Sequence, residues 1–268
     1  MKERPTVGIA LGAGAARAYA HIGVLQVFEE NKIPVDCISG CSMGAFIGAI
    51  YATGGDAYFL ERLLPEFSEK VFIDYRISRK GLVKGNKAET LIKILTKAKN
   101  IEQTDIPFRC VAVNLERGTL KVFDKGPIYK AVRASISMPG LFVPYSIGRY
   151  HFVDGGIIER LPITPLRGLG ADLVIGVDVS YRGEVQKTPK NVMGIMAKIL
   201  NITSWEIAKD KMNDADVLIL PEVREIAPYS NNDAKMCIAR GREAAKDALP
   251  EIMDKYEALS KRPVPKEA

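Results

Sequence analysis

The stretch VDCISGCSMGAFIGAI, residues 35–50, combines a strand, a sharp turn and a helix in one short segment. Its first five residues are mostly apolar and predict a strand, and the part from Met43 onward predicts a helix. Between them Gly40 and Gly44 flank Ser42 in a G-x-S-x-G pattern, whose glycines let strand and helix backbones pass closely. Such a turn holds the serine backbone in a strained conformation and exposes its hydroxyl group. The hydroxyl then lies beside a helix N-terminus, which favours negative charge. This context favours a nucleophilic Ser42 over an unreactive serine in a glycine-rich turn.

The size and composition of the chain indicate one large α/β domain. The chain has 268 residues, 47% of them hydrophobic, so we expect a single domain over 1–260 and a loose tail over 261–268. No apolar run reaches the ~18 residues of a membrane span, and the N-terminus leads into a glycine loop instead of a cleavage site. The four cysteines lack metal-ligand spacing, and Cys37, Cys41 and Cys110 are expected to be buried on strands. A reducing, cytoplasmic setting is the simplest interpretation.

Strands alternate with helices along the chain. Strands are predicted over residues 6–11, 35–39, 108–114, 119–123, 150–153, 172–179 and 217–220. Helices are predicted over 18–31, 43–52, 58–70, from 86, over 128–137 and 191–213, and over 233–259 with a possible break at Pro250. This order predicts a three-layer α/β/α sandwich around a mostly parallel sheet.

A glycine loop, GAGAAR, joins the first strand to the first helix. It resembles the G-x-G-x-x-G nucleotide fingerprint, but Arg17 occupies the place of the third glycine. Backbone N–H groups beside a helix-opening arginine suit an anion, and a developing oxyanion fits as well as a phosphate. An ordinary tight turn is the alternative for this loop taken alone.

Residues 56–100 form a possible lid or membrane-docking insertion directly after the predicted nucleophile. No clear strand is expected there, and Asn86 with Glu89 suggests a capping box at a helix start. Between Arg76 and Lys99 there are eight Lys or Arg residues and one acid, and these contribute to the net charge of +6. We expect this stretch to contact anionic membrane surfaces, with an odd but solvated helix face as the alternative.

A serine nucleophile needs a base, and the chain offers two kinds. It has only two histidines, His21 in the first helix and His151 on a strand after Ser42. A serine–acid–His151 order is formally possible. Asp154, however, stands at a strand end before Gly155 and Gly156, where it could accept the serine proton directly if burial raises its pKa. A plain Asp-Gly-Gly turn is the alternative for that tripeptide in isolation.

Several motifs together resemble the patatin-like phospholipases, specifically their compact bacterial branch. They are LGAGAARAYAHIGVL (11–25), GCSMGA (40–45), AVRASISMPGLFVP (131–144), FVDGG (152–156) and LGADLVIGVDVS (169–180). The resemblance implies a three-layer α/β/α fold, a Ser–Asp dyad and hydrolysis of lipid esters without a metal or other cofactor. It assigns the nucleophile to Ser42 and the base to Asp154. It also assigns the oxyanion loop, namely Gly12, Ala13, Gly14, Ala15 and Arg17.

The chain departs from the family pattern at two places. Ala13, Ala15 and Ala18 stand where the family commonly has glycine, and alanine resists a positive φ. The asparagine that often follows Asp-Gly-Gly is absent near Arg160. Both departures bear on rate and substrate preference more than on the reaction class.

The sequence therefore predicts a serine acyl hydrolase acting on phospholipids, lysophospholipids or related lipids. An acyltransferase using the same dyad and a non-catalytic lipid-binding protein are the alternatives. The expected partners are a lipid ester and, peripherally, an anionic membrane, but no nucleic acid. The sequence indicates neither the oligomeric state nor the lipid.

Overall fold

A sheet of eight strands forms the centre of the protein. The computed structural model describes residues 4–66, 75–78, 81–180, 182–183, 188–226 and 233–261. The strand order is β10-β9-β1-β2-β5-β8-β7, with β6 paired to β5 outside this path. The strands are β1 Val7–Leu11, β2 Cys37–Cys41, β5 Phe108–Asn114, β6 Thr119–Phe123, β7 Tyr145–Ile147, β8 Tyr150–Asp154, β9 Leu173–Val177 and β10 Val217–Ile219. The run from β10 to β5 is parallel, whereas β6, β7 and β8 pair antiparallel, so the sheet is mostly parallel as predicted.

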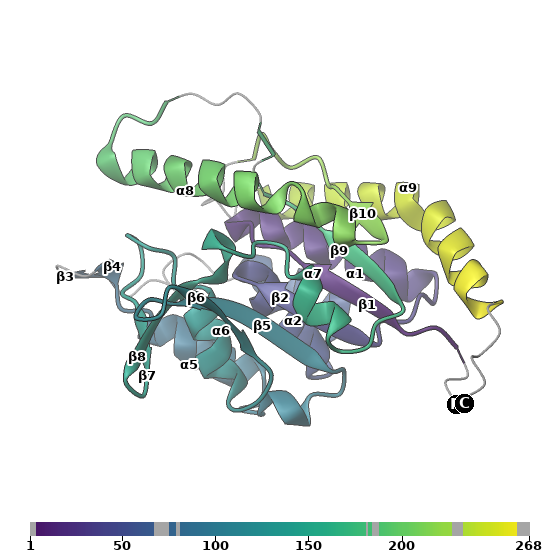
Figure 1. The fold of residues 1–268 in the computed structure, drawn as a ribbon, viewed down its shortest axis with the longest axis horizontal. Coiled ribbons are helices and arrows are strands. Elements are labelled where there is room, and N and C mark those ends of the chain that lie inside the picture. The colour runs from purple at the N-terminus through teal and green to yellow at the C-terminus, as the bar shows by residue number, and fades with distance from the viewer. Residues whose placement is uncertain are drawn as a thin grey trace.

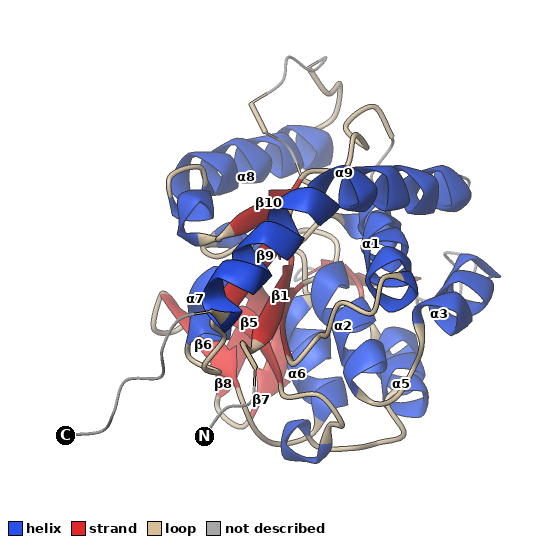
Figure 2. Cartoon of the chain, turned by 90° about the vertical axis from the view of Figure 1, so that its right-hand side faces the viewer, coloured by secondary structure: helices blue, strands red, loops and turns tan. Residues whose placement is uncertain are grey.

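Helices cover both faces of this sheet (Figures 1 and 2). The helices are α1 Tyr19–Glu30, α2 Met43–Ala52, α3 Ala57–Leu63, α5 Asn86–Leu95, α6 Ile128–Ser135, α7 Ile163–Arg167, α8 Val192–Ala208 and α9 Ala234–Ser260. Figure 2 shows α1, α2 and α5 on one side of the sheet and α7 on the other. The layered α/β/α arrangement expected from the sequence is confirmed.

The alternation of side chains along β1 explains the two layers. Val7, Ile9 and Leu11 belong to the larger apolar cluster, which includes the side chains of α1 and α2. Ala10 belongs to a second cluster, together with Leu166 of α7. Successive residues of a strand point to opposite faces of a sheet. Both faces of β1 are therefore buried, as expected for a central parallel strand.

Two strands end against each other along one edge of β5. β2 runs parallel to β5, and its last residue, Cys41, pairs with Val111. β8 runs antiparallel to β5, and its last residue, Asp154, pairs with Ala112, the next position. β6 occupies the opposite edge, since it pairs with the same β5 residues as β2 and β8 do. The end of β2 and the end of β8 are consequently neighbours, although more than a hundred residues separate them in sequence.

Residues 56–100 differ from the expectation. A two-stranded antiparallel sheet, β3 Tyr75–Ser78 with β4 Gly81–Val83, lies where no strand was expected. β-branched and aromatic residues next to Gly81 could have signalled this hairpin. The helix predicted over 58–70 is α3, followed by a 3-10 turn at Leu64–Glu66; Phe67 and Phe72 lie outside the described residues.

The helix after this hairpin begins at Asn86 as predicted, but without the expected capping box. Its N-cap is Gly85, whose φ of 77° lies in the left-handed region that favours glycine. Asn86 is therefore the first residue of the helix and not its N-cap, so Asn86 and Glu89 do not form a capping box. A capping box exists instead at Asn100 and Gln103, at the start of a short 3-10 helix.

Pro250 does not interrupt α9, contrary to the suggested break. The helix continues from Ala234 to Ser260 with Pro250 inside it, and it bends toward its C-terminal end (Figure 1). Proline removes one backbone hydrogen bond and crowds the preceding turn, so a bend is its usual effect. The short elements β7 and α7 were not predicted, and the tail beyond Lys261 lies outside the described residues.

Helices α1 and α9 cross at two glycines. A Cβ atom added at Gly241 would lie 1.9 Å from the carbonyl oxygen of Ala20, and one at Gly23 would lie 2.0 Å from that of Ile238. Neither position has room for a side chain because the neighbouring atoms belong to the backbone of the facing helix. The crossing thus holds α9 directly against the helix that follows the glycine loop.

We predict that Gly241→Ala destabilises the protein by about 1–3 kcal/mol, the usual range for an overpacked interior site. The two helices must separate to admit the methyl group. Urea unfolding followed by circular dichroism measures the change. Lys235→Ala, on the exposed side of the same helix, is the control and should shift stability by less than about 0.5 kcal/mol. An unchanged midpoint for Gly241→Ala would show that the crossing is looser than described.

Candidate active site

Ser42 and Asp154 are brought together at the meeting point of β2 and β8. The Ser42 hydroxyl donates a hydrogen bond to Asp154 Oδ2 over 2.6 Å. Ser42 follows β2 directly and Asp154 is the last residue of β8, so the shared edge of β5 positions both. A serine hydroxyl within hydrogen-bonding distance of a carboxylate is the geometry required for proton transfer between them.

The backbone at Ser42 adopts the conformation of a nucleophile elbow. Its φ of 54° and ψ of −125° are unusual for a residue with a side chain, and it is the N-cap of α2. Such a conformation costs about 1–3 kcal/mol, which the surrounding structure must offset. A Cβ at Gly44 would lie 2.2 Å from the carbonyl oxygen of Leu11, and one at Gly40 would lie 2.4 Å from Ala45 Cα. The close approach inferred for Gly40 and Gly44 is therefore present.

The Asp154 carboxylate is buried but well supplied with donors. Its Oδ1 accepts a hydrogen bond from the Gly156 N–H at 2.8 Å, and the Cys41 thiol lies 3.7 Å away. Burial raises the pKa of Asp154 to about 6, because desolvation outweighs these hydrogen bonds. Gly155 has no room for a side chain, since a Cβ would meet the Val111 carbonyl oxygen at 2.6 Å. The carboxyl group is thus suited to accept a proton near neutral pH.

The glycine loop lies beside both residues. A Cβ at Gly44 would lie 2.5 Å from the Gly12 carbonyl oxygen, and one at Gly156 would lie 3.4 Å from Ala13 Cβ. The loop's first two N–H groups already have acceptors: Gly12 donates to Val177 at 3.0 Å and Ala13 donates to Arg160 at 2.8 Å. Within the described residues, the N–H groups of Gly14, Ala15 and Ala16 have no such acceptor, whereas the Arg17 N–H donates to the Gly14 carbonyl oxygen at 3.1 Å.

The backbone of Ala15 and the side chain of Arg17 show how the expected oxyanion loop is held in place. Ala15 has a φ of 50°, so an alanine adopts the positive φ for which glycine would be better suited. The Arg17 side chain is buried and donates to the carbonyl oxygens of Ile226, at 2.8 Å, and Arg224, at 2.7 Å. Arg17 therefore anchors the loop to the segment before α9.

The two histidines lie in different surroundings, and neither contacts Ser42. His21 is fully buried, and its Nε2 is 2.8 Å from the Gly12 carbonyl oxygen, which makes Nε2 the protonated nitrogen. Burial lowers the pKa of His21 to about 4, so the ring is neutral. His151 lies at the surface, with Nδ1 2.6 Å from Glu116 Oε1. The contact gives His21 a structural role, since its ring holds the glycine loop.

Three serines that the sequence did not single out support the site. The Ser135 hydroxyl accepts a hydrogen bond from the Ser42 N–H at 2.9 Å. Ser204 of α8 donates to the Gly156 carbonyl oxygen at 2.6 Å, and Ser180 donates to the Ala13 carbonyl oxygen. Ser135 and Ser180 lie inside the motifs 131–144 and 169–180, but isolated serines carry no pattern that would assign them a role.

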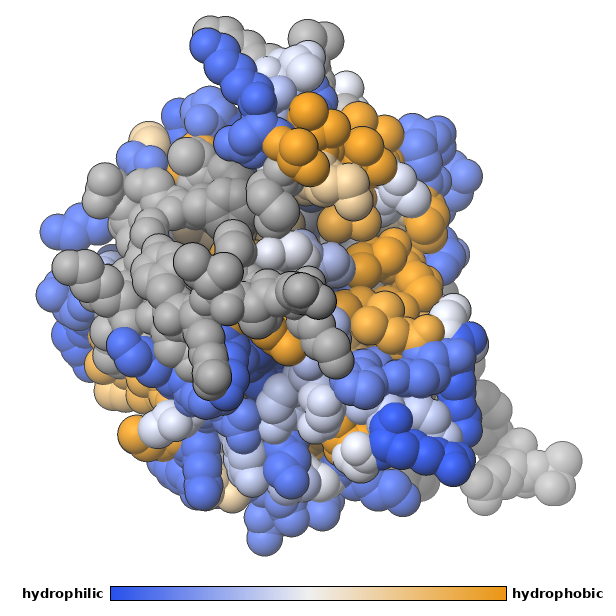
Figure 3. All heavy atoms as spheres, turned by 90° about the vertical axis from the view of Figure 1, so that its left-hand side faces the viewer, coloured by the Kyte–Doolittle hydropathy of each residue, from blue (hydrophilic) through white to orange (hydrophobic). Residues whose placement is uncertain are grey.

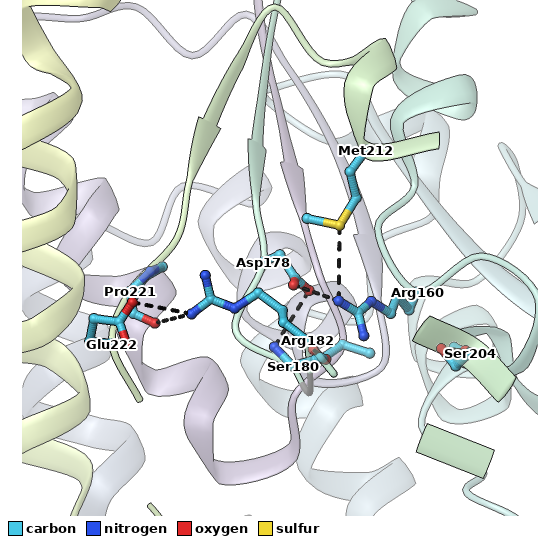
Figure 4. Close-up of polar contacts among 10 residues, drawn as sticks. Arg160, Asp178, Ser180, Arg182, Ser204, Met212, Pro221 and Glu222 are labelled. Carbon is cyan, nitrogen blue, oxygen red and sulfur yellow. Dashed lines mark hydrogen bonds and ion pairs between the residues drawn. The ribbon is translucent and has the colours of Figure 1, made fainter. Parts of the chain in front are cut away.

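A buried ion pair between Arg160 and Asp178 lies next to the residues that hold the glycine loop. Arg160 Nη2 lies 2.7 Å from Asp178 Oδ2, and neither residue is more than 2% exposed. The Arg160 guanidinium also stacks 4.9 Å from the Trp205 ring. Figure 4 shows Arg160 and Asp178 pointing toward each other, with Ser180 beside them. The Arg160 carbonyl and the Ser180 hydroxyl both hold Ala13, so this pair and the loop form one unit.

We predict that Asp178→Asn lowers the free energy of unfolding by about 3–5 kcal/mol, because it removes the negative charge of a buried ion pair while the Arg160 charge stays buried. Urea unfolding provides the measurement. Glu251→Gln, which breaks an exposed ion pair with Lys255, is the control and should cost less than about 1 kcal/mol. Equal effects of the two variants would contradict a structural role for the buried pair.

The described residues hold no group of three or more His, Cys, Asp or Glu side chains arranged to bind a metal ion. All four cysteines are buried and free, as expected for Cys37, Cys41 and Cys110. No described helix combines the length and the hydropathy needed to cross a membrane.

The fold and the serine elbow define an α/β protein of the patatin type. The sequence model for patatin-like phospholipases matches residues 9–167, which is more than half of the chain. The chain therefore belongs to the patatin-like phospholipase family.

Relatives by sequence carry the name NTE. An uncharacterized NTE family protein of Mycobacterium tuberculosis strain H37Rv is 36% identical over 192 residues, covering 70% of this chain and 53% of that protein. The lysophospholipase NTE1 of Pyricularia oryzae is 32% identical over 181 residues, covering 65% of this chain and 12% of that protein. The chain thus spans about half of the bacterial relative and a small part of the fungal one.

Solved structures show the same fold at low sequence identity. VipD from Legionella pneumophila superposes with a TM-score of 0.65 at 13% identity, covering 96% of this chain and 67% of VipD. The type III effector ExoU gives a TM-score of 0.53 at 14% identity, covering 94% of this chain and 53% of ExoU.

Proposed function

We propose that this chain is a serine acyl hydrolase that cleaves ester bonds of phospholipids, lysophospholipids or related lipids. The 2.6 Å contact between Ser42 and Asp154 carries the proposal. Membership of the patatin-like phospholipase family and the lysophospholipase NTE1 among the relatives support the lipid substrate. The single domain over 1–260 and a cytoplasmic, peripherally membrane-bound location belong to the same proposal, and the four buried free cysteines are compatible with it.

The reaction follows from the positions of the two side chains. Ser42 Oγ attacks the ester carbonyl carbon while its proton passes to Asp154 Oδ2. The carbonyl oxygen becomes an oxyanion, which the N–H groups of Gly14 and Ala15 and the N-terminus of α2 stabilise. Asp154 then protonates the departing alcohol. Asp154 next deprotonates a water molecule, which attacks the acyl carbon bound to Ser42 Oγ. The bond between the acyl carbon and Oγ then breaks, Asp154 returns the proton to Ser42 Oγ, and the fatty acid leaves.

An acyltransferase and a non-catalytic lipid-binding protein remain distinct alternatives. The first would pass the acyl group from Ser42 to an alcohol or thiol, and the second would leave Ser42 unmodified. Two measurements separate all three functions. The first is labelling of Ser42 by a fluorophosphonate probe, and the second is the amount of fatty acid released with and without an acceptor alcohol. Labelling of Ser42 with acid release and no transfer product supports hydrolysis, whereas transfer or the absence of labelling contradicts it.

Ser42→Ala and Asp154→Asn are each predicted to reduce hydrolysis of a short p-nitrophenyl ester by more than about a thousandfold. The first removes the nucleophile, and the second replaces the proton acceptor by an amide. His151→Gln is the matched control and should stay close to wild-type activity, because His151 contacts Glu116 at the surface. Retention of more than about a tenth of the activity by Ser42→Ala would place the nucleophile elsewhere.

The pH dependence should report the pKa of Asp154. Burial raises this pKa to about 6, so the carboxyl group is protonated below that pH and cannot act as a base. We predict that kcat/KM for a soluble ester falls on the acid side of an apparent pKa near 6. A limb near 4 would indicate a solvated carboxylate. The His151→Gln variant should show the same acid limb in its kcat/KM profile. Loss of this limb in the variant would assign the titrating group to His151 and not to Asp154.

A further inference from the structure

Helix α8 leaves an unusual amount of apolar surface exposed. Of the twelve large hydrophobic side chains that are exposed in the described part of the chain, six lie on this helix. Five of them follow each other along its first turns, namely Val192, Ile195, Met196, Ile199 and Ile202. Their exposed fractions are 75%, 41%, 52%, 50% and 40%, respectively. We call these five residues the α8 stripe.

Helical spacing places the α8 stripe on one side of the helix. Steps of three and four residues connect its members, and residues so spaced share a helix face. Figure 3 shows apolar side chains gathered in the upper right of the molecule, on the side where α8 lies. A single exposed leucine or isoleucine is ordinary, whereas a contiguous apolar patch marks an interaction surface.

The other end of α8 is fixed to the candidate active site. Ser204 donates to the Gly156 carbonyl oxygen at 2.6 Å, two residues after Asp154. Trp205 stacks on Arg160, and Ala208 is buried. The helix is therefore anchored beside the Asp154 turn and presents its apolar residues from there outward. The α8 stripe therefore belongs to a helix whose far end is hydrogen-bonded to the turn that follows Asp154.

The charges around the stripe indicate what it contacts. Residues 188–205 contain Lys190 and Lys198 but no Asp or Glu, and the first acid is Glu206. An apolar helix face bordered by lysines is the pattern of a helix that lies in the interface of a bilayer with anionic lipids.

A second copy of this chain fits the stripe less well. The ten steps from Val192 to Ile202, at about 1.5 Å each, make the stripe roughly 15 Å long, and it is about one helix wide, some 10 Å. Stable protein interfaces bury about 800 Å² on each partner, several times this footprint. Lys190 and Lys198 of two copies would also repel each other across such a contact.

We propose that the α8 stripe is the surface by which this protein rests on a lipid bilayer, with its apolar side chains below the headgroups and Lys190 among anionic headgroups. The inference rests on the proposed lipid hydrolase activity, whose substrate such a docking would bring to Ser42. It differs from the docking through the basic stretch 76–99 that the sequence suggested. There Lys97 Nζ donates to the Thr53 carbonyl oxygen at 3.0 Å, so one of those lysines is used within the protein.

The test is sedimentation with phosphatidylcholine vesicles and with vesicles of equal parts phosphatidylcholine and phosphatidylglycerol. The test variant replaces Val192, Met196 and Ile199 by Gln. The control variant replaces Ile94, Met236 and Met253 by Gln, three side chains that are exposed on other helices. All proteins also carry Ser42→Ala, so that hydrolysis does not alter the vesicles. Gln keeps helix propensity in both sets.

We expect the test variant to lose at least about tenfold in the ratio of bound to free protein, because three apolar side chains no longer leave water. The control variant should bind like the parent. Binding of the parent to mixed vesicles should weaken but persist at ~1 M salt, where charge attraction is screened within about 3 Å. With Ser42 restored, the test variant should also hydrolyse vesicle lipid more slowly relative to a soluble ester.

Three results would overturn the proposal. The test variant could bind as the parent does. Binding could instead vanish at high salt and on replacing Lys84, Lys87 and Lys93 by Gln, which would favour the basic stretch. Alternatively, the test variant could change from dimer to monomer with vesicle binding unchanged, which would make the stripe an interface between copies. Failure of the hydrolase proposal is distinguishable, since it would appear with soluble esters and leave vesicle binding intact.

Discussion

The contact between Ser42 and Asp154 depends on β5, which accepts two strand ends along one of its edges. β2 and β8 approach this edge from opposite directions and stop at the adjacent positions Val111 and Ala112. The arrangement places a carboxyl group where protein surrounds it, and the pKa of Asp154 rises to about 6 for that reason. Between its ordinary pKa and this value the folded state binds more protons than the unfolded state, so the Asp154 contribution to stability decreases as pH rises through that range. A carboxyl group whose pKa is raised by burial, at a cost in stability, is frequent at functional sites.

Hydrogen bonds from several elements of the fold hold the first two residues of the glycine loop, Gly12 and Ala13. Val177 and Arg160 accept its first two N–H groups, while His21 and Ser180 donate to its carbonyl oxygens. This support lets an alanine, Ala15, keep a φ of 50°. The loop can therefore carry fewer glycines than its family usually has, because tertiary contacts replace the conformational freedom that glycine would provide.

The peripheral elements connect the buried site to the lipid that we propose as substrate. α9 packs against α1 at Gly23 and Gly241, and it thereby fixes the helix that follows the glycine loop. α8 is fixed at Ser204 and extends its apolar stripe away from the site. β3 and β4 project beyond the sheet at the left of Figure 1, where α8 also begins. Close packing around Ser42 and exposed apolar side chains on one neighbouring helix are thus separate features of one fold.

Much of the site could be predicted from the sequence because local motifs determine local geometry. The pattern around Ser42 determined the strand, the turn and the helix, and the alternation of strands and helices determined a layered, mostly parallel sheet. The hairpin β3–β4, the glycine N-cap at Gly85 and the continuous helix through Pro250 were missed, since short or weakly patterned segments leave the choice to their surroundings. Only the tertiary structure decided that Asp154 meets Ser42, that Arg17 turns to the carbonyls before α9, and that Arg160 and Asp178 pair behind the loop. These contacts join residues far apart in sequence. Their formation depends on strand order and register, and no single motif encodes them.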